Sequence, residues 1–95
     1  MTNIEKFISL FDGDERYLNG LCYWFAHILD TRFPGGDIWY DPVMNHFYYV
    51  FDDVAYDVRG RVVLPNISIK WDDYYAYDAL DYQRVVKYCI LKEDN

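Results

Sequence analysis

The residues from Asn19 to Phe33, NGLCYWFAHILDTRF, constrain the fold more than any other part of the chain. Read at helical spacing, this stretch has a narrow polar side and apolar residues over most of its circumference. The spacing therefore predicts a largely buried helix with Asn19 as its N-cap. Cys22 then lies in the first turn, where unpaired backbone N–H groups and the positive end of the helix dipole favour a thiolate. A small cysteine of the core fits the same position.

The whole composition favours one globular domain over residues 1–95, with 53% apolar residues and a net charge of −7. This charge argues against direct binding to nucleic acid or to an anionic membrane surface, and it is compatible with a basic protein partner. No apolar run reaches the length of a membrane span, and Glu5 and Lys6 interrupt the N-terminal apolar positions. Two cysteines form no disulfide framework, so we expect a cytoplasmic protein with reduced thiols and leave its oligomeric state open.

The order of the expected elements is helix, helix, several antiparallel strands and helix, which predicts an α+β domain. A short helix capped by Asn3 comes first, and a closing helix capped by Asp78 runs over residues 79–91. The expected strands cover residues 37–40, 46–51, 54–59, 61–64 and 67–71. The last two would pair across a turn at Pro65-Asn66.

The hairpin over residues 46–59 makes Cys22 a candidate nucleophile. With a two-residue turn at Asp52-Asp53, the numbers of paired residues sum to 105, so Asp57 projects from the same face as His46, one diagonal step away. Diagonal neighbours lie about 7–8 Å apart between backbones, close enough for a carboxylate to bond an imidazole. If the buried helix packs on that face with its N-terminus over the hairpin, Cys22 completes a Cys–His–Asp arrangement for nucleophilic catalysis.

This order of a cysteine opening a buried helix, a histidine starting a strand and an aspartate on the next strand resembles the papain-like superfamily. NlpC/P60 peptidases and transglutaminase-like domains are the nearest in layout. The strings GLCYWFA, FPGGDIWYD, NHFYYVFDD and YDVRG are also similar to small proteins of bacteria and their phages, over about Asn19 to Gly60. The resemblance implies a minimal papain-like core: a helix carrying the cysteine packed on a small antiparallel sheet. It also implies a cysteine hydrolase or acyltransferase that acts on an amide or related acyl bond of a protein or peptide-like substrate. Cys22 would be the nucleophile, His46 the base and Asp57 the residue that orients the imidazole.

The oxyanion hole departs from the pattern of these enzymes. They often place a glutamine several residues before the cysteine, and this chain has Arg16 there. Asn19, or the backbone N–H groups of Cys22 and Tyr23, are the candidates to replace it. The segment after Gly60 follows no enzyme pattern, so a non-catalytic protein on the same fold is the alternative.

The tract from Trp71 to Tyr82 is the second functional candidate, because aspartates are interspersed with tyrosines along it. Exposed, this pattern would suit a basic groove on a partner, with carboxylates in place of phosphates and rings in place of bases. The candidate contact residues are Asp72, Asp73, Tyr74, Tyr75, Tyr77 and Asp78. In a phage-encoded chain this would be an anti-defence (anti-CRISPR-like) inhibitor of a nucleic-acid-binding protein in the host cytoplasm. Alternatively, the rings close the core and the aspartates are only solvated.

The remaining histidine and cysteine are weaker candidates. His27 lies about 140° around the helix from Cys22 and is expected at the surface, and Cys89 is expected in the core on the last helix. Paired-ligand spacing such as C-x-x-C is absent, so we expect no metal site and no other cofactor.

Overall fold

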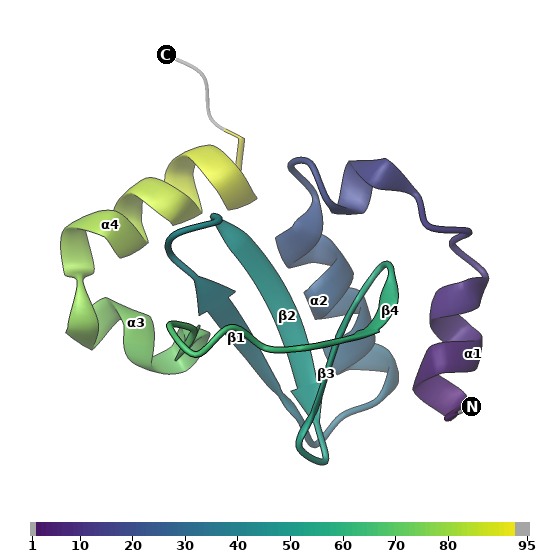
Figure 1. Cartoon of the computed structure of the whole chain (residues 1–95). Coiled ribbons are helices and arrows are strands. Elements are labelled where there is room, and N and C mark those ends of the chain that lie inside the picture. The colour runs from purple at the N-terminus through teal and green to yellow at the C-terminus, as the bar shows by residue number, and fades with distance from the viewer. Residues whose placement is uncertain (1, 93–95) are drawn as a thin grey trace.

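The computed structural model describes residues 2–92 and has an α+β fold around one antiparallel sheet (Figure 1). The sheet has five strands in the order β4-β3-β2-β1-β5. The strands are β1 (Asp37–Asp41), β2 (His46–Phe51), β3 (Val54–Asp57), β4 (Gly60–Val62) and β5 (Ile69–Lys70). The helices are α1 (Asn3–Ser9), α2 (Cys22–Arg32), α3 (Trp71–Tyr77) and α4 (Ala79–Arg84). A 3₁₀ turn, η1 (Glu15–Tyr17), precedes α2, and a π-helical segment, η2 (Val85–Ile90), continues α4.

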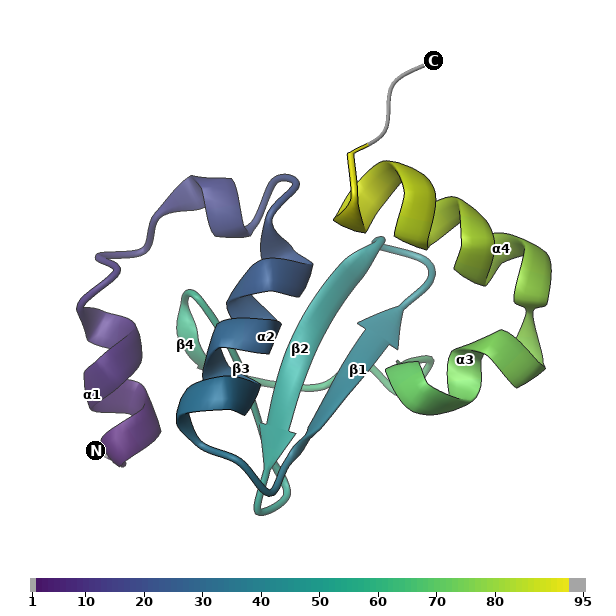
Figure 2. The same ribbon diagram turned by 180° about the vertical axis from the view of Figure 1, so that it is seen from behind.

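Helix α2 packs across one face of the sheet, with α1 beyond it (Figure 2). It buries Phe25, Ala26 and Leu29, which join Phe47 and Tyr49 of β2 in the core. The prediction that most of its circumference is buried is wrong, because Trp24 is 38% exposed. His27 is exposed, as predicted. The helix is therefore amphipathic, and its buried side faces the odd-numbered side chains of β2.

Both predicted N-caps of the first two helices are wrong. Thr2 caps α1, and it forms a capping box with Glu5 in which both hydrogen bonds measure 3.1 Å. Leu21 precedes α2 and supplies no side-chain cap, while the Asn19 amide donates to the carbonyl of Glu15 at 3.2 Å. Helix α2 therefore begins at Cys22 itself, and the thiol still lies in the first turn.

The hairpin of β2 and β3 has the predicted register. Tyr49 pairs with Tyr56 and Phe51 with Val54, so the numbers sum to 105. Asp52 and Asp53 adopt φ values of +51° and +62°, as a type I′ turn requires at both central positions. Strand β3 ends at Asp57, two residues earlier than predicted, because a second tight turn leads into β4, where Gly60 pairs with Asp57.

The second half of the chain differs from the prediction at the sheet edges. Residues 61–64 and 67–71 do not pair as a hairpin, since β4 lies beside β3 while β5 pairs with β1 at the opposite edge. The connection between β4 and β5 crosses the face of the sheet opposite to α2 (Figures 1 and 2). The tract that follows, which showed no clear periodicity, forms α3, and Asp78 caps α4 as predicted by accepting from the Asp81 N–H at 3.0 Å. None of the helices within residues 2–92 is long and apolar enough to cross a membrane.

Candidate active site

His46 and Asp57 form a buried pair at the end of the sheet. The Nε2 atom of His46 lies 3.0 Å from Oδ2 of Asp57, and the two residues are only 7% and 3% exposed. His46 opens β2 and Asp57 closes β3, so the antiparallel register brings them together on one face. The predicted diagonal contact is confirmed. A buried carboxylate with a hydrogen-bonded partner avoids the large cost of an isolated buried charge.

Cys22 reaches this pair by a different route from the one expected. Helix α2 packs on the opposite face of the sheet, so the condition that it covers the face of His46 is not met. Cys22 instead approaches at the end of β2, where its Sγ lies 4.0 Å from the carbonyl oxygen of Asn45 and interacts with the imidazole of His46. His46 is the first residue of β2, so its ring lies at the end of the sheet where Cys22 opens α2. Nε2 is occupied by Asp57, which leaves Nδ1 for the thiol.

The charges of the three residues reinforce one another. Burial opposes ionisation of the Cys22 thiol, but hydrogen bonding to His46 and to the N–H groups of Phe47 and Tyr23 keeps its pKa below the usual value. Burial would lower the pKa of His46, but hydrogen bonds and charges from Asp57 and Cys22 raise it to about 9. For Asp57, burial is outweighed by hydrogen bonds from His46 and Arg59, and the pKa falls to about 2. The arrangement therefore favours a thiolate–imidazolium pair beside an ionised carboxylate.

Arg59 is a fourth member of the cluster that the sequence reasoning missed. Its Nε atom lies 3.1 Å and 3.0 Å from the two carboxylate oxygens of Asp57, and its Nη2 also donates to Oδ2. Its backbone N–H donates to Oδ1 at 2.8 Å. The string Asp57-Val58-Arg59-Gly60 carries a signal for this contact, since an aspartate that accepts from the N–H two residues on is typical of an Asx turn.

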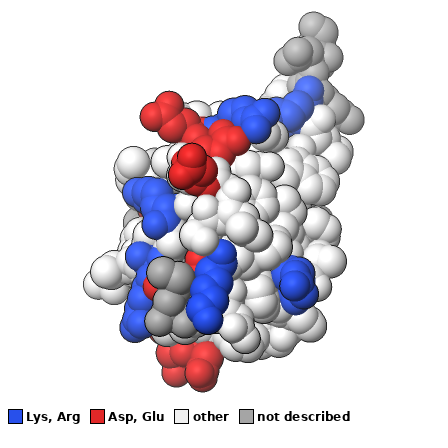
Figure 3. All heavy atoms as spheres, turned by 90° about the vertical axis from the view of Figure 1, so that its right-hand side faces the viewer, with Lys and Arg blue, Asp and Glu red and all other residues white. Residues whose placement is uncertain are grey.

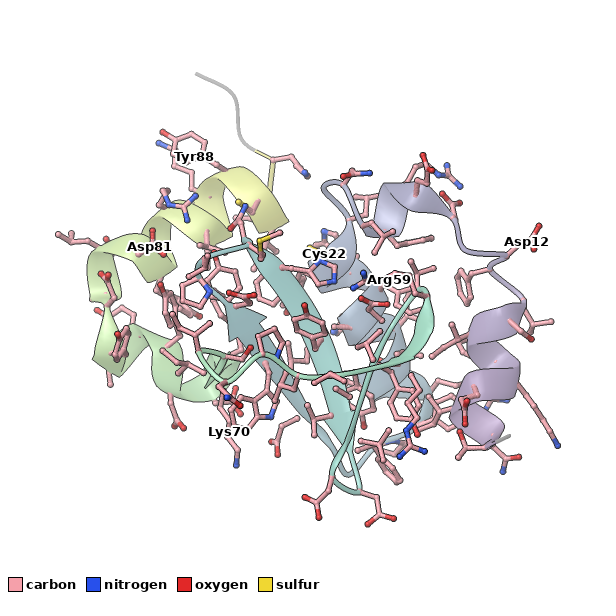
Figure 4. The ribbon with its side chains drawn as sticks, viewed as in Figure 1. Asp12, Cys22, Arg59, Lys70, Asp81 and Tyr88 are labelled. Carbon is pink, nitrogen blue, oxygen red and sulfur yellow. The ribbon has the colours of Figure 1, made fainter. Side chains whose placement is uncertain are left out.

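A surface depression of about 320 Å³ opens beside His46. Its lining combines apolar and polar side chains, namely Leu18, Asn19, Met44, His46, Tyr48 and Arg59. Asn19 thus reaches the depression although it does not cap α2. The ring of Tyr23 packs edge-on against Phe47, with centroids 5.1 Å apart, so only its backbone N–H is directed to the cysteine sulfur. Cys22 and Arg59 are both labelled in Figure 4, at the start of α2 and near the turn into β4.

Asn45 links the site to the C-terminal helices, and sequence reasoning did not single it out. Its φ is +52°, and its side chain accepts a hydrogen bond from the Tyr40 hydroxyl. Its amide also donates to Sγ of Cys89 at 3.4 Å. Cys89 is half-buried with these polar contacts, so its prediction as an ordinary core residue is only partly right.

The acidic aromatic tract is divided between core and surface. Tyr74 is 2% exposed, and its hydroxyl donates to Asp81 at 2.6 Å, so its prediction as an exposed contact residue is wrong. Tyr75 and Tyr77 are 54% and 70% exposed. The aspartates of this tract that were expected at the surface are exposed, namely Asp72, Asp73 and Asp78. The exposed residues lie on α3 and at its C-terminal end, on the far side of β1 from α2 (Figure 1).

Within the described part of the chain, His, Cys, Asp and Glu nowhere form a group of three that could hold a metal ion.

The comparisons with known proteins identify the family of the chain. Searches of curated proteins and of solved structures found no match. A family model described as "Phage YunG-like protein" matches residues 4–90, which is nearly the whole chain and includes the cluster around Cys22 and His46. The chain therefore belongs to the phage YunG-like protein family.

Proposed function

We propose that this phage YunG-like protein is a cysteine hydrolase or acyltransferase with a compact papain-like core. The observation that carries the proposal is the buried His46–Asp57 pair at 3.0 Å, which meets Cys22 at the start of α2. A nucleophile, a base in contact with it and a third group that orients the base are the parts that covalent acyl transfer requires.

The reaction would proceed through an acyl-enzyme. The Cys22 thiolate attacks the carbonyl carbon of an amide or related acyl bond, and the C–S bond forms while the carbonyl electrons move to oxygen. His46, protonated in the resting pair, donates its proton to the leaving amine as the C–N bond breaks. Water or another acceptor then gives a proton to His46 and attacks the thioester, which releases Cys22. Asp57 holds the ring through Nε2 and stabilises its positive charge throughout.

The developing oxyanion needs hydrogen-bond donors close to Cys22. Its own backbone N–H is at the first position of α2, where helices leave N–H groups without intrahelical partners. The Asn19 amide, which lines the depression, is the second donor that we propose. Arg16, at the position where papain-like enzymes often carry glutamine, is instead paired with Asp14 at 2.6 Å and is 75% exposed.

Selective alkylation tests this proposal. Cys22 should react with iodoacetamide near pH 6, which is well below the pKa of about 8.5 of a free thiol. Cys89 provides the internal control, since its sulfur contacts the side chains of Asn45 and Arg84, and it should label slowly in the folded protein. Peptide mapping by mass spectrometry after short exposure distinguishes the two thiols. Equal and slow labelling of both would remove Cys22 as a nucleophile.

A second function is favoured by the exposed side of α3. Asp72, Asp73 and Tyr77 present carboxylates and a ring to solvent, which suits a stoichiometric inhibitor that occupies a basic groove of a host protein. Such a binder would act in the host cytoplasm without chemistry at Cys22. The two functions differ in stoichiometry, because a catalyst acts at amounts far below those of its target.

A further inference from the structure

The depression beside His46 is lined by basic and neutral side chains although the molecule is acidic. The chain carries a net charge of −7, yet no carboxylate is among the described residues that line this depression. Arg59 contributes a permanent positive charge to the lining, and Asn19 and Tyr48 contribute neutral polar groups. The neighbouring side of the molecule, which carries α1 and η1, has basic side chains interspersed with acidic ones (Figure 3).

The guanidinium of Arg59 is available to a ligand although it is paired. Its side chain is 53% exposed, whereas the Asp57 carboxylate that it contacts is 3% exposed. The pairing uses Nε and Nη2, which form one edge of the planar group. A guanidinium has five N–H donors; Asp57 and the Tyr48 hydroxyl engage part of them, and the remaining N–H groups can donate to a ligand. The negative partner therefore lies behind the positive group, as seen from solvent.

The position of Arg59 relates this charge to the reacting atoms. Asp57 contacts both Arg59 and His46 through Oδ2, so the guanidinium and the imidazole are neighbours on one carboxylate. The imidazole also interacts with the thiol of Cys22. A group bound by Arg59 would thus lie beside the same Asp57–His46 pair with which the Cys22 thiol interacts.

We propose that the site selects substrates that carry a carboxylate near the scissile acyl bond, and that Arg59 is the residue that recognises this carboxylate. The inference deepens the proposed function and rests on it. A guanidinium matches a carboxylate in geometry and charge, which makes it well suited to this selection. The apolar side chains of Leu18 and Met44 would pack against the carbon atoms of the same substrate.

Two alkylating reagents that differ only in charge test the inference. Iodoacetate and iodoacetamide both react by attack of the thiolate sulfur on the CH₂ carbon, with formation of the C–S bond and loss of iodide. The quantity measured is the ratio of their rates at Cys22, because damage to the thiolate or its geometry affects both reagents alike. The positive charge of His46 raises the iodoacetate-to-iodoacetamide ratio in the wild type and in every variant that retains His46. The effect of Arg59 therefore appears as a difference in this ratio between the wild type and the Arg59 variants.

Arg59→Gln should lower the iodoacetate-to-iodoacetamide ratio roughly three- to tenfold, as expected for removal of one charge at close range in a partly exposed site. Arg61→Gln is the matched control because it removes the same charge from an exposed position on β4. Arg61 does not line the depression. This variant should leave the ratio unchanged. Arg59→Lys should retain most of the preference, because the charge remains. An unchanged ratio in Arg59→Gln would overturn the inference.

Protection of the wild-type protein gives a measurement that needs no variant. Succinate should slow the labelling of Cys22 by iodoacetamide, whereas its neutral analogue succinamide should not, and added salt should weaken the protection. Equal effects of the two compounds would contradict a carboxylate site. Failure of the proposed function is distinguishable from these results: Cys22 would then react slowly with both reagents near pH 6, whatever the charge at Arg59.

Discussion

The end of the sheet around Cys22 and the exposed side of α3 carry charge in opposite ways. At the sheet end, an imidazole and a carboxylate are buried and contact each other, and a guanidinium covers them. On α3, the carboxylates of Asp72 and Asp73 project into solvent while Trp71 and Tyr74 occupy the core. The same residue type, aspartate, is thus part of a coupled cluster in one region and a solvated surface group in the other.

The difference shows where chemistry is to be sought in such a small protein. A buried charged group is stable only with a partner of opposite charge or a hydrogen-bond partner. Each residue of the sheet-end cluster supplies such a partner to its neighbour. Coupled, perturbed pKa values at a surface depression are typical of functional sites. The aspartates of α3 need no such explanation, since water solvates them. Four experiments sharpen or break this contrast, in decreasing order of expected effect.

Loss of the proposed nucleophile should have the largest effect. Cys22→Ala should reduce turnover of an activated ester such as p-nitrophenyl acetate by about 10³-fold or more, because no acyl-enzyme can form. The triple change of Asp72, Asp73 and Asp78 to Asn should leave turnover within about twofold, since these residues lie outside the site. Initial rates of the three proteins, corrected for the uncatalysed reaction, make the comparison.

The opposite pattern would favour the inhibitor. If the triple variant no longer inhibits a host target while Cys22→Ala inhibits fully at one-to-one dosage, the side of α3 is the functional surface. Its binding would then weaken steeply as salt rises, because exposed charges are screened over about 10 Å or less.

Removal of the proposed base should have the next largest effect. His46→Ala should slow the alkylation of Cys22 near pH 6 by roughly 10- to 100-fold, because the imidazolium no longer stabilises the thiolate. The measurement is the rate of labelling across a pH series, in which the reaction of the variant should shift toward the range of a free thiol. His27→Ala is the control, since this exposed histidine lies on the other side of α2 and should leave the profile unchanged.

The acid dependence of stability should be smaller but specific to Asp57. Its pKa is about 2 in the folded protein and 3.8 for the ordinary group, so the unfolded chain binds more protons between these values. The stability that the ionised carboxylate contributes is therefore present above about pH 4 and is lost as the pH falls through about 2.

Asp57→Asn should remove this part of the pH dependence, on the order of 2 kcal/mol. Urea unfolding of wild type and variant between about pH 5 and pH 2 measures it. Asp72→Asn is the matched control from the solvated region and should follow the wild type. Parallel curves for all three proteins would mean that Asp57 is not held ionised by its neighbours.

The smallest effect separates buried from exposed rings within α3. Tyr74→Phe removes a buried hydroxyl that donates to Asp81, and it should reduce the free energy of unfolding by about 1 kcal/mol. Tyr77→Phe changes a ring that is 70% exposed and should stay within about 0.5 kcal/mol of the wild type. Equal losses in thermal unfolding would show that the two tyrosines are not divided between core and surface.

Local patterns in the sequence were sufficient to predict one part of the site, the contact between His46 and Asp57. Alternation along residues 46–51 and a two-residue turn at Asp52-Asp53 predicted the register, and the register predicted the contact of His46 with Asp57. Both depend only on the period of two in a strand and on the geometry of a tight turn. The same reasoning failed at Pro65-Asn66, where a plausible turn separates two strands that pair with different neighbours.

The caps were mispredicted for a related reason. Asn19 and Asn3 both have the right chemistry for an N-cap, but η1 ends close to Asn19 and engages its amide, and Thr2 forms the capping box of α1. Arg59 was overlooked because a salt bridge across a turn depends on where the chain leads after the strand. That direction is set by Gly60, with its φ of +104°, and by the pairing of β4.

By itself, the sequence determined which residues could meet along one hairpin and that a cysteine would open the central helix. Only the tertiary structure decided how these two parts come together. Helix α2 packs on the face of the sheet that carries Phe47 and Tyr49. Burial of large apolar side chains there contributes more free energy than the contacts of a single thiol on the other face. Cys22 meets His46 because both stand at the ends of their elements, and such a meeting depends on the packing of elements that are far apart in the sequence.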